Sequence, residues 1–360
     1  MQEQNLIFLI SQPRSGSTFV QKILGSHPEI LTLSEPWFML SLAYTLKDKG
    51  IFSEYDKKSE YIAVREFLNS IPKGRKLYVQ KIKQLCLEIY GQNLINNDKR
   101  IFLDKTPRYY FIINELLEIF PKSKIILLRR NPLSILHSIY TTWTQESWFR
   151  LSDFRHDLLD GLFLLNKAPK SNQLLSIKYE DLLLNPKKEF KRLSSFIAVD
   201  YDNNMLSYNN SSTFLFGDKS DKILSGRINQ ESPNGWESSS LSYQQWRVLW
   251  DYLQLIGEKE FAAAGYDYRL AQFALTQNMP TSCIEAIYDD TYSLRNLLDH
   301  TKNSLYDNLR LQKNVELLEK QLDTQRNELK MYKYHHNSKN NISLKELLNL
   351  LIKRIINKLF

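Results

Sequence analysis

Short apolar runs that are each followed by a helical pattern constrain the fold of this chain more than any other feature. Three such runs are Leu6–Ile10, Ile101–Leu103 and Ile125–Leu128, and Leu174–Lys178 is a fourth candidate. Strands that are apolar throughout are buried on both faces, and parallel strands need crossover helices to join them. We therefore predict an α/β fold in which a central parallel β-sheet is flanked by helices.

The length and composition of the chain are those of a soluble globular protein. Of its 360 residues, 42% are hydrophobic and 24% are charged, which excludes wholesale disorder. Two cysteines cannot build a disulfide framework or a cysteine-rich zinc site. Residues 1–5 lack the basic segment of a signal peptide, and no stretch approaches the roughly 20 apolar residues that span a bilayer. We expect a cytoplasmic, reduced protein that uses no metal.

The net charge of +8 belongs mainly to the C-terminal tail. Residues 301–360 hold 12 Lys and Arg against 6 Asp and Glu, so the first 300 residues carry a net charge of only +2. A nucleic-acid-binding protein would show a basic patch with interleaved aromatic residues on its main domain. We therefore expect no nucleic-acid partner.

The extension that follows the main domain carries a heptad pattern. Apolar side chains recur at spacings of four, three, four and seven, at Leu311, Val315, Leu318, Leu322 and Leu329. This seam predicts a coiled coil over residues 285–334, through which the chain would self-associate. A long solvated helix docked on the main domain is the alternative. The main domain is then expected to occupy residues 1–275.

The last segment, residues 342–360, has the pattern of a basic amphipathic helix. Ser343 and Glu346 form a capping box. Leucine and isoleucine residues form one face of the helix, and Lys345, Lys353 and Arg354 lie on the opposite face. Such a helix can dock on a protein partner or lie on an anionic membrane surface, here the inner face of the cell membrane. We place a protein partner or self-docking ahead of lipid, because core-facing helices carry similar stripes.

Residues 11–18, with the sequence SQPRSGST, have the composition of an anion-binding loop between a strand and a helix. Gly16 permits a tight turn, Ser17 and Thr18 supply hydroxyl groups, and the helix N-terminus offers unpaired N–H groups. Arg14 adds a fixed positive charge. The segment fails the Walker pattern, because serines stand where the first glycine and the lysine should be. For this segment alone, a strand-to-helix turn with a capping serine is the favoured interpretation.

A second candidate segment runs from Lys124 to Ser138. A strand ends at Arg129-Arg130, Asn131-Pro132 turn the chain, and a helix begins. Arg130 and Ser138 could both reach a ligand at the carboxyl edge of the sheet. Alternatively, Arg130 caps a turn and Ser138 fills a helix face. Together the two segments indicate an adenine nucleotide with phosphates at two places.

At these residues the chain resembles sulfotransferases that use 3′-phosphoadenosine 5′-phosphosulfate, in particular the carbohydrate and tyrosylprotein branches, which have a P-loop-like fold. Pro13–Thr18 resembles the 5′-phosphosulfate loop of that family, and Arg130 with Ser138 resembles its 3′-phosphate motif. Asp104–Pro107 and Tyr179–Leu182 resemble two further family segments, and Ser34-Glu35-Pro36 resembles the segment that carries the base. The resemblance covers roughly residues 5–265.

The resemblance implies a role for each of these residues. The loop residues Arg14, Ser15, Gly16, Ser17 and Thr18 would hold the 5′-phosphosulfate. Arg130 and Ser138 would hold the 3′-phosphate, and Tyr179 would lie by the adenine unless it is a core aromatic residue. Glu35, after the apolar stretch Ile30–Leu33, would be the general base, and Arg14 and Lys105 would stabilise the leaving oxygen. His27 and His137 are alternative bases, but we favour a structural role for each of them.

The expected function is therefore transfer of a sulfuryl group to a hydroxyl, which the Ser-Glu-Pro resemblance assigns to a carbohydrate or glycan. A tyrosine, a lipid-linked glycan or a small metabolite stays open as acceptor. A P-loop-type kinase of a small metabolite is one alternative, although Ser17 stands where its lysine should be. A non-catalytic scaffold that presents the coiled coil is the other.

Overall fold

The structure, a computed structural model, describes residues 1–33, 35–50, 54–206, 235–238 and 240–280. The chain divides into two units, Met1–Asp299 and His300–Phe360, and the described residues all belong to the first. The coiled coil predicted over residues 285–334 and the basic helix predicted over 342–360 lie outside the described residues. No helix in the described ranges is both long and apolar enough to cross a membrane.

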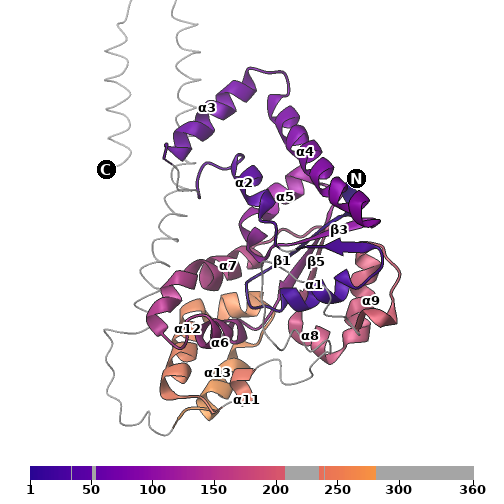
Figure 1. Ribbon diagram of the computed structural model, residues 1–360. Coiled ribbons are helices and arrows are strands. Elements are labelled where there is room, and N and C mark those ends of the chain that lie inside the picture. Colours follow the sequence, from indigo (N-terminus) through magenta and orange to yellow (C-terminus); the bar gives the residue numbers. More distant parts are fainter. Residues whose placement is uncertain (34, 51–53, 207–234, 239, 281–360) are drawn as a thin grey trace, which may run out of the picture. The chain divides into compact units, whose positions relative to one another are not determined.

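A parallel sheet forms the centre of the first unit (Figure 1). In spatial order its strands are β2 (Ile30–Thr32), β3 (Ile101–Lys105), β1 (Leu6–Ser11), β4 (Lys124–Arg129) and β5 (Leu174–Lys178). Every neighbouring pair is parallel, and Phe8 of β1 lies beside Asp104 of β3 and Ile125 of β4. The predicted α/β fold with a central parallel sheet is confirmed.

Helices cover both faces of this sheet because alternate residues of each strand point in opposite directions. Leu6 and Phe8 pack in one apolar core, and Ile7 and Leu9 pack in another. The first core contains residues of α2 (Phe38–Tyr44), α4 (Gly74–Asn97) and α5 (Ile113–Ile119). The second contains residues of α1 (Ser17–Gly25), α8 (Tyr179–Leu184) and α9 (Pro186–Ile197). Figure 1 shows the two sets on opposite sides of the strands.

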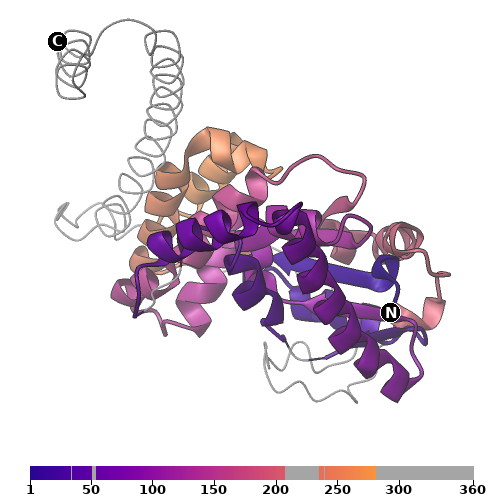
Figure 2. The ribbon, with the colours of Figure 1, turned by 90° about the horizontal axis from the view of Figure 1, so that it is seen from above.

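Between β2 and β3 the chain also forms α3 (Lys57–Asn69), which precedes α4. We call these two helices the arm. Asp56 caps α3 by accepting a hydrogen bond from the Lys58 amide. Figure 2, which looks at the molecule from above, shows the two helices of the arm meeting at an angle on the side of the sheet that carries α2. The arm is therefore an insertion between β2 and β3, and its helix α4 also packs in the first core.

Further helices follow β3 and β4 and make up the later part of the described chain. They include the 3₁₀-helix η2 (Pro107–Ile112), α6 (Pro132–Thr142), α7 (Gly161–Asn166), α11 (Gly235–Ser238), α12 (Tyr243–Ala263) and α13 (Tyr268–Gln277). Helix α12 bends at Gly257, where φ is 71°. Trp246 and Trp250 stack with ring centroids 5.5 Å apart, as their helical spacing predicts.

Candidate functional site

The loop between β1 and α1 turns through two residues in the left-handed region, with φ of 66° at Arg14 and 87° at Gly16. A Cβ at residue 16 would lie 2.4 Å from two ring carbons of Tyr179, so only glycine lets the ring approach this closely. The Ser15 hydroxyl is buried and has no hydrogen-bond partner within the described part of the chain. A buried hydroxyl next to a helix N-terminus is available to donate to an anion.

Glu35 and Lys105 form an ion pair where β3 ends. Lys105 is only 1% exposed, and its Nζ lies 2.6 Å from Glu35 Oε1. The same Nζ lies 3.4 Å from Oγ1 of Thr18, in the first turn of α1. The Glu35 side chain keeps 13% of its surface exposed. A buried ammonium group therefore lies between an accessible carboxylate and the loop.

A second set of contacts fixes the other oxygen of Glu35. The indole Nε1 of Trp37 donates to Glu35 Oε2 at 3.2 Å. Trp37 has a φ of 55°, a left-handed conformation that is uncommon and strained for a bulky aromatic residue. The Arg108 guanidinium lies over this indole, 5.3 Å from its centroid, and makes hydrogen bonds of 2.8 and 2.6 Å to Asp157. Asp157 is 2% exposed, so this chain of contacts ends in the core.

Asp104, which precedes the ion-paired lysine, is a fully buried carboxyl group. Its oxygens accept hydrogen bonds from the hydroxyl groups of Tyr90 at 2.6 Å, Thr106 at 2.9 Å and Tyr109 at 3.0 Å. Burial raises the pKa of Asp104 to about 6, although the three hydrogen bonds act to lower it; the negative charge of Glu35 also raises it. These contacts fix the end of β3 and hence the lysine that follows.

Arg14 and Arg130 meet on the other side of the loop. Arg14 Nε donates to Ser138 Oγ at 3.0 Å, and its guanidinium lies 5.5 Å from the centroid of the Trp143 ring. Arg130 Nη1 donates to the carbonyl oxygen of Arg14 at 2.9 Å and lies over the Tyr179 ring at 4.7 Å. Burial lowers the pKa of Arg130, but arginine stays charged in proteins. Two guanidinium groups and a hydroxyl thus share one network.

The turn after β4 is held by a buried carboxylate. Glu180 Oε1 accepts a hydrogen bond from the Asn131 amide at 2.9 Å, and Oε2 accepts one from the Tyr266 hydroxyl at 2.7 Å. The Asn131 side chain accepts from the Leu133 amide at 3.0 Å and so caps α6. This turn fixes the backbone at Arg130.

The two histidines that the sequence offered as alternative bases differ in their surroundings. His27 is 4% exposed, its Nδ1 accepts from the Glu29 amide at 3.2 Å, and its Nε2 lies 3.0 Å from the Asp200 carbonyl oxygen. Both ring nitrogens therefore serve the backbone. Burial lowers the pKa of His137, and the charge of Arg130 lowers it further, so this imidazole is neutral near pH 7.

The predicted site residues therefore fall into two groups. One joins Glu35, Lys105 and Thr18, and the other joins Arg14, Arg130, Ser138 and Tyr179. Ser15, Gly16 and Ser17 lie in the loop and first turn between them. Arg14 was expected beside Lys105 at the leaving oxygen, but its guanidinium contacts include Ser138 and Trp143.

Three residues that the sequence did not single out contact this site. Trp37 and Arg108 each lie within three residues of Glu35 or Lys105, so proximity in sequence was a usable signal. Asp157 gives no local signal, because it lies 49 residues after Arg108 in the chain. Within the described ranges, no cluster of three or more His, Cys, Asp or Glu could hold a metal ion.

The chain is similar in sequence to several known proteins. A model of the sulfotransferase family matches residues 6–203. The nodulation protein NoeE of Sinorhizobium fredii is 25% identical over 297 residues, which cover 74% of this chain and 67% of that protein. A protein-tyrosine sulfotransferase of Drosophila melanogaster is 23% identical over 57% of this chain and 40% of its own length. The sulfotransferase domain of the Synechococcus PCC 7002 olefin synthase aligns with a TM-score of 0.48 and 19% identity, covering 73% of this chain and 94% of the domain.

Proposed function

Because this chain belongs to the sulfotransferase family, we propose that it moves a sulfuryl group from 3′-phosphoadenosine 5′-phosphosulfate to a carbohydrate hydroxyl, with Glu35 as general base. Family membership makes the chain a transferase that acts on an acceptor substrate. The observation that carries the proposal is the ion pair of Glu35 with buried Lys105, 3.4 Å from Thr18 of the loop. A base and a cation at an anion-binding loop are what sulfuryl transfer requires.

The residues of the loop and of the arginine network fit a donor with two phosphate positions. The buried Ser15 hydroxyl, without a partner in the described ranges, and the N-terminus of α1 suit the 5′ end of the donor. Arg130, Arg14 and Ser138 suit the 3′-phosphate, because guanidinium groups bind phosphate oxygens in pairs. The donor, when bound, supplies the sulfuryl group.

The chemistry of the chain's own residues is then acid–base and electrostatic. Glu35 accepts the proton of the acceptor hydroxyl as the acceptor oxygen bonds to sulfur and the bond from sulfur to the phosphate oxygen breaks. The electron pair of the broken bond stays on that oxygen. Lys105 is buried and already directed at the loop, so it can stabilise this charge with little rearrangement. We therefore assign Lys105 to the leaving oxygen and Arg14 to the phosphates.

Trp37 and Arg108 act in this proposal as positioning residues. Lys105 and Trp37 bind different oxygens of Glu35, which leaves the carboxylate little freedom to rotate. Arg108 holds the indole from the opposite side and is itself fixed by Asp157. A base held in one orientation needs no reordering when the acceptor arrives.

Replacing Trp37 by phenylalanine tests this positioning role. Phenylalanine keeps an aromatic face for Arg108 but loses the indole N–H that binds Glu35. A hydrogen bond to a charged group contributes about 1.5–3 kcal/mol, so we expect kcat to fall about tenfold or more. KM for donor and acceptor should stay within about twofold of wild type. An unchanged kcat, or a loss confined to KM, would contradict a positioning role.

Donor selectivity tests the proposed function. Adenosine 3′,5′-bisphosphate should raise the melting temperature of the protein, whereas ADP, which lacks a 3′-phosphate, should have little effect. Incubation with radiolabelled donor and panels of glycans, tyrosine peptides and phenols should then label a glycan. Stabilisation by ADP or ATP alone would favour the alternative of a small-metabolite kinase. Labelling confined to tyrosine peptides would keep the sulfuryl transfer and change the acceptor class.

A further inference from the structure

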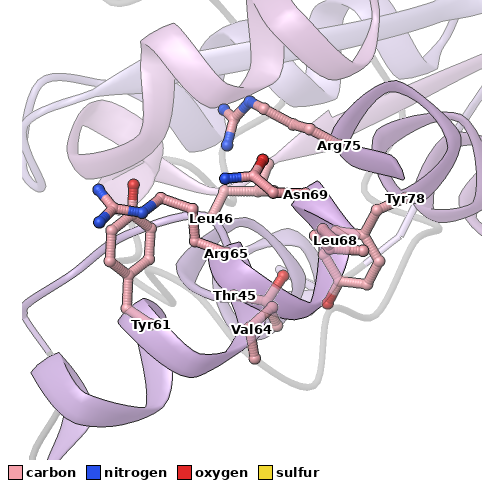
Figure 3. A pocket seen from close by; sticks show the side chains of 9 residues that line it. All are labelled: Thr45, Leu46, Tyr61, Val64, Arg65, Leu68, Asn69, Arg75 and Tyr78. Carbon is pink, nitrogen blue, oxygen red and sulfur yellow. The ribbon is translucent and has the colours of Figure 1, made fainter. Parts of the chain in front are cut away.

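A pocket of about 320 Å³ lies in the arm, against the end of α2 (Figure 3). Tyr61 and Arg65 of α3 form part of its wall, Arg75 and Tyr78 of α4 form another part, and Thr45 closes it after α2. None of its lining residues belongs to the groups around Glu35 or Arg130. Small-molecule sites typically have volumes of about 300–1,000 Å³, so the pocket is large enough for a ligand the size of one ring.

The lining of this pocket separates apolar from polar groups. Figure 3 shows Val64 and Leu68 on one side, and the polar ends of Arg65, Asn69 and Arg75 gathered on the other. Tyr61 is half-buried, which exposes part of its phenol ring to a ligand. The pocket therefore offers an aromatic and aliphatic surface together with several hydrogen-bond donors.

Both arginines that line the pocket contact other side chains, and the charge of Arg75 is balanced by a carboxylate. Arg75 makes two hydrogen bonds of 2.9 Å to the carboxylate of Glu118. The Arg65 guanidinium lies 5.9 Å from the centroid of the Tyr61 ring. A phosphate group would need converging, unbalanced positive charge, and an acyl chain would leave the arginine and asparagine donors without partners. A ring with an apolar face and hydroxyl groups at its edge, which is a sugar, satisfies both parts of the lining.

Helix α2 connects this pocket to the carboxylate of Glu35. Trp37 precedes α2 and binds Glu35, while Thr45 follows α2 and lines the pocket. Eight residues at 1.5 Å per residue separate these two positions by about 12 Å along the helix axis. A single sugar cannot reach both places, whereas an oligosaccharide can.

We propose that the arm pocket is an outer acceptor subsite, which binds a sugar ring of an oligosaccharide at some distance from the ring that receives the sulfuryl group. This inference rests on the proposed function, since it assumes a carbohydrate acceptor at Glu35. It assigns the selection of acceptor length to the arm, the insertion between β2 and β3. Tyr61 provides the stacking surface, and Asn69 and Arg65 provide hydrogen bonds to hydroxyl groups.

Binding to immobilised glycans of one to six sugars tests the subsite without requiring turnover. The parent protein is Glu35→Gln, to which Tyr61→Ala or Asn69→Ala is added. Phe67→Ala is the matched control, because Phe67 is on the same helix, is 67% exposed and does not line the pocket. A thermal shift with adenosine 3′,5′-bisphosphate verifies that each variant is folded.

We expect Tyr61→Ala to weaken binding of glycans of three or more sugars about tenfold and to leave monosaccharide binding unchanged. Asn69→Ala should also weaken binding of the longer glycans. Phe67→Ala should bind like the parent. Equal binding by all variants, or no glycan bound by the parent, would overturn the subsite. If these variants differ as expected but wild type transfers no label to any glycan, the proposed function fails while the sugar-binding pocket stands.

Discussion

Glu35→Gln should fold normally, bind adenosine 3′,5′-bisphosphate with near-native affinity and lose turnover by roughly 10²–10⁴-fold, the usual contribution of a general base. Glutamine has the shape of glutamate, and its carbonyl oxygen can still accept a hydrogen bond from Lys105. Its amide cannot take a proton from the acceptor hydroxyl. The measurement is single-turnover transfer from radiolabelled donor, with donor-product affinity by calorimetry.

The matched control for this substitution is Glu29→Gln. Glu29 forms an ion pair with Arg100, and their side chains are 39% and 45% exposed, respectively. The substitution therefore removes a carboxylate at the surface. This control should retain the wild-type rate. If Glu35→Gln keeps more than about a tenth of that rate, the base lies elsewhere. His137 would then be the next residue to replace, since both nitrogens of His27 are engaged with the backbone.

The sheet could be predicted from the sequence because burial on both faces leaves a signal in the sequence itself. In β1, Leu6 and Phe8 serve one core and Ile7 and Leu9 serve the other, so every position must be apolar. The positions of the loop and of Glu35 follow from the same strands, because chemistry-bearing residues come directly after them. The strand ends thus predict where these residues lie, whereas their roles follow from the resemblance to sulfotransferases and stay predictions.

The orientation of long side chains could not be predicted in the same way. Arg14 follows the first strand, as Lys105 ends another, yet the Arg14 guanidinium contacts Ser138 and Trp143. Asp157 escaped notice because no periodicity marks a buried carboxylate whose partner lies 49 residues away.

A second large effect is expected for Arg130→Ala, on affinity for the donor. We expect the Kd for adenosine 3′,5′-bisphosphate to rise about 30-fold or more, because losing a hydrogen-bonded charge in a buried site typically costs about 2–5 kcal/mol. The measurement is calorimetric titration. Acceptor binding should be unchanged, since Glu35, Trp37 and Lys105 contact one another independently of Arg130.

Adenosine 5′-monophosphate makes this prediction specific to the 3′-phosphate. That ligand lacks the group that Arg130 is proposed to bind, so its affinity should be nearly equal in wild type and Arg130→Ala. Arg192→Ala is the protein control, because Arg192 is 49% exposed and pairs with Glu189 on its own helix. An equal loss for both nucleotides would mean that Arg130 supports the loop through the Arg14 carbonyl and the Tyr179 ring. A loss for the bisphosphate alone requires direct contact, because a displaced loop would weaken the 5′-phosphate of both ligands alike.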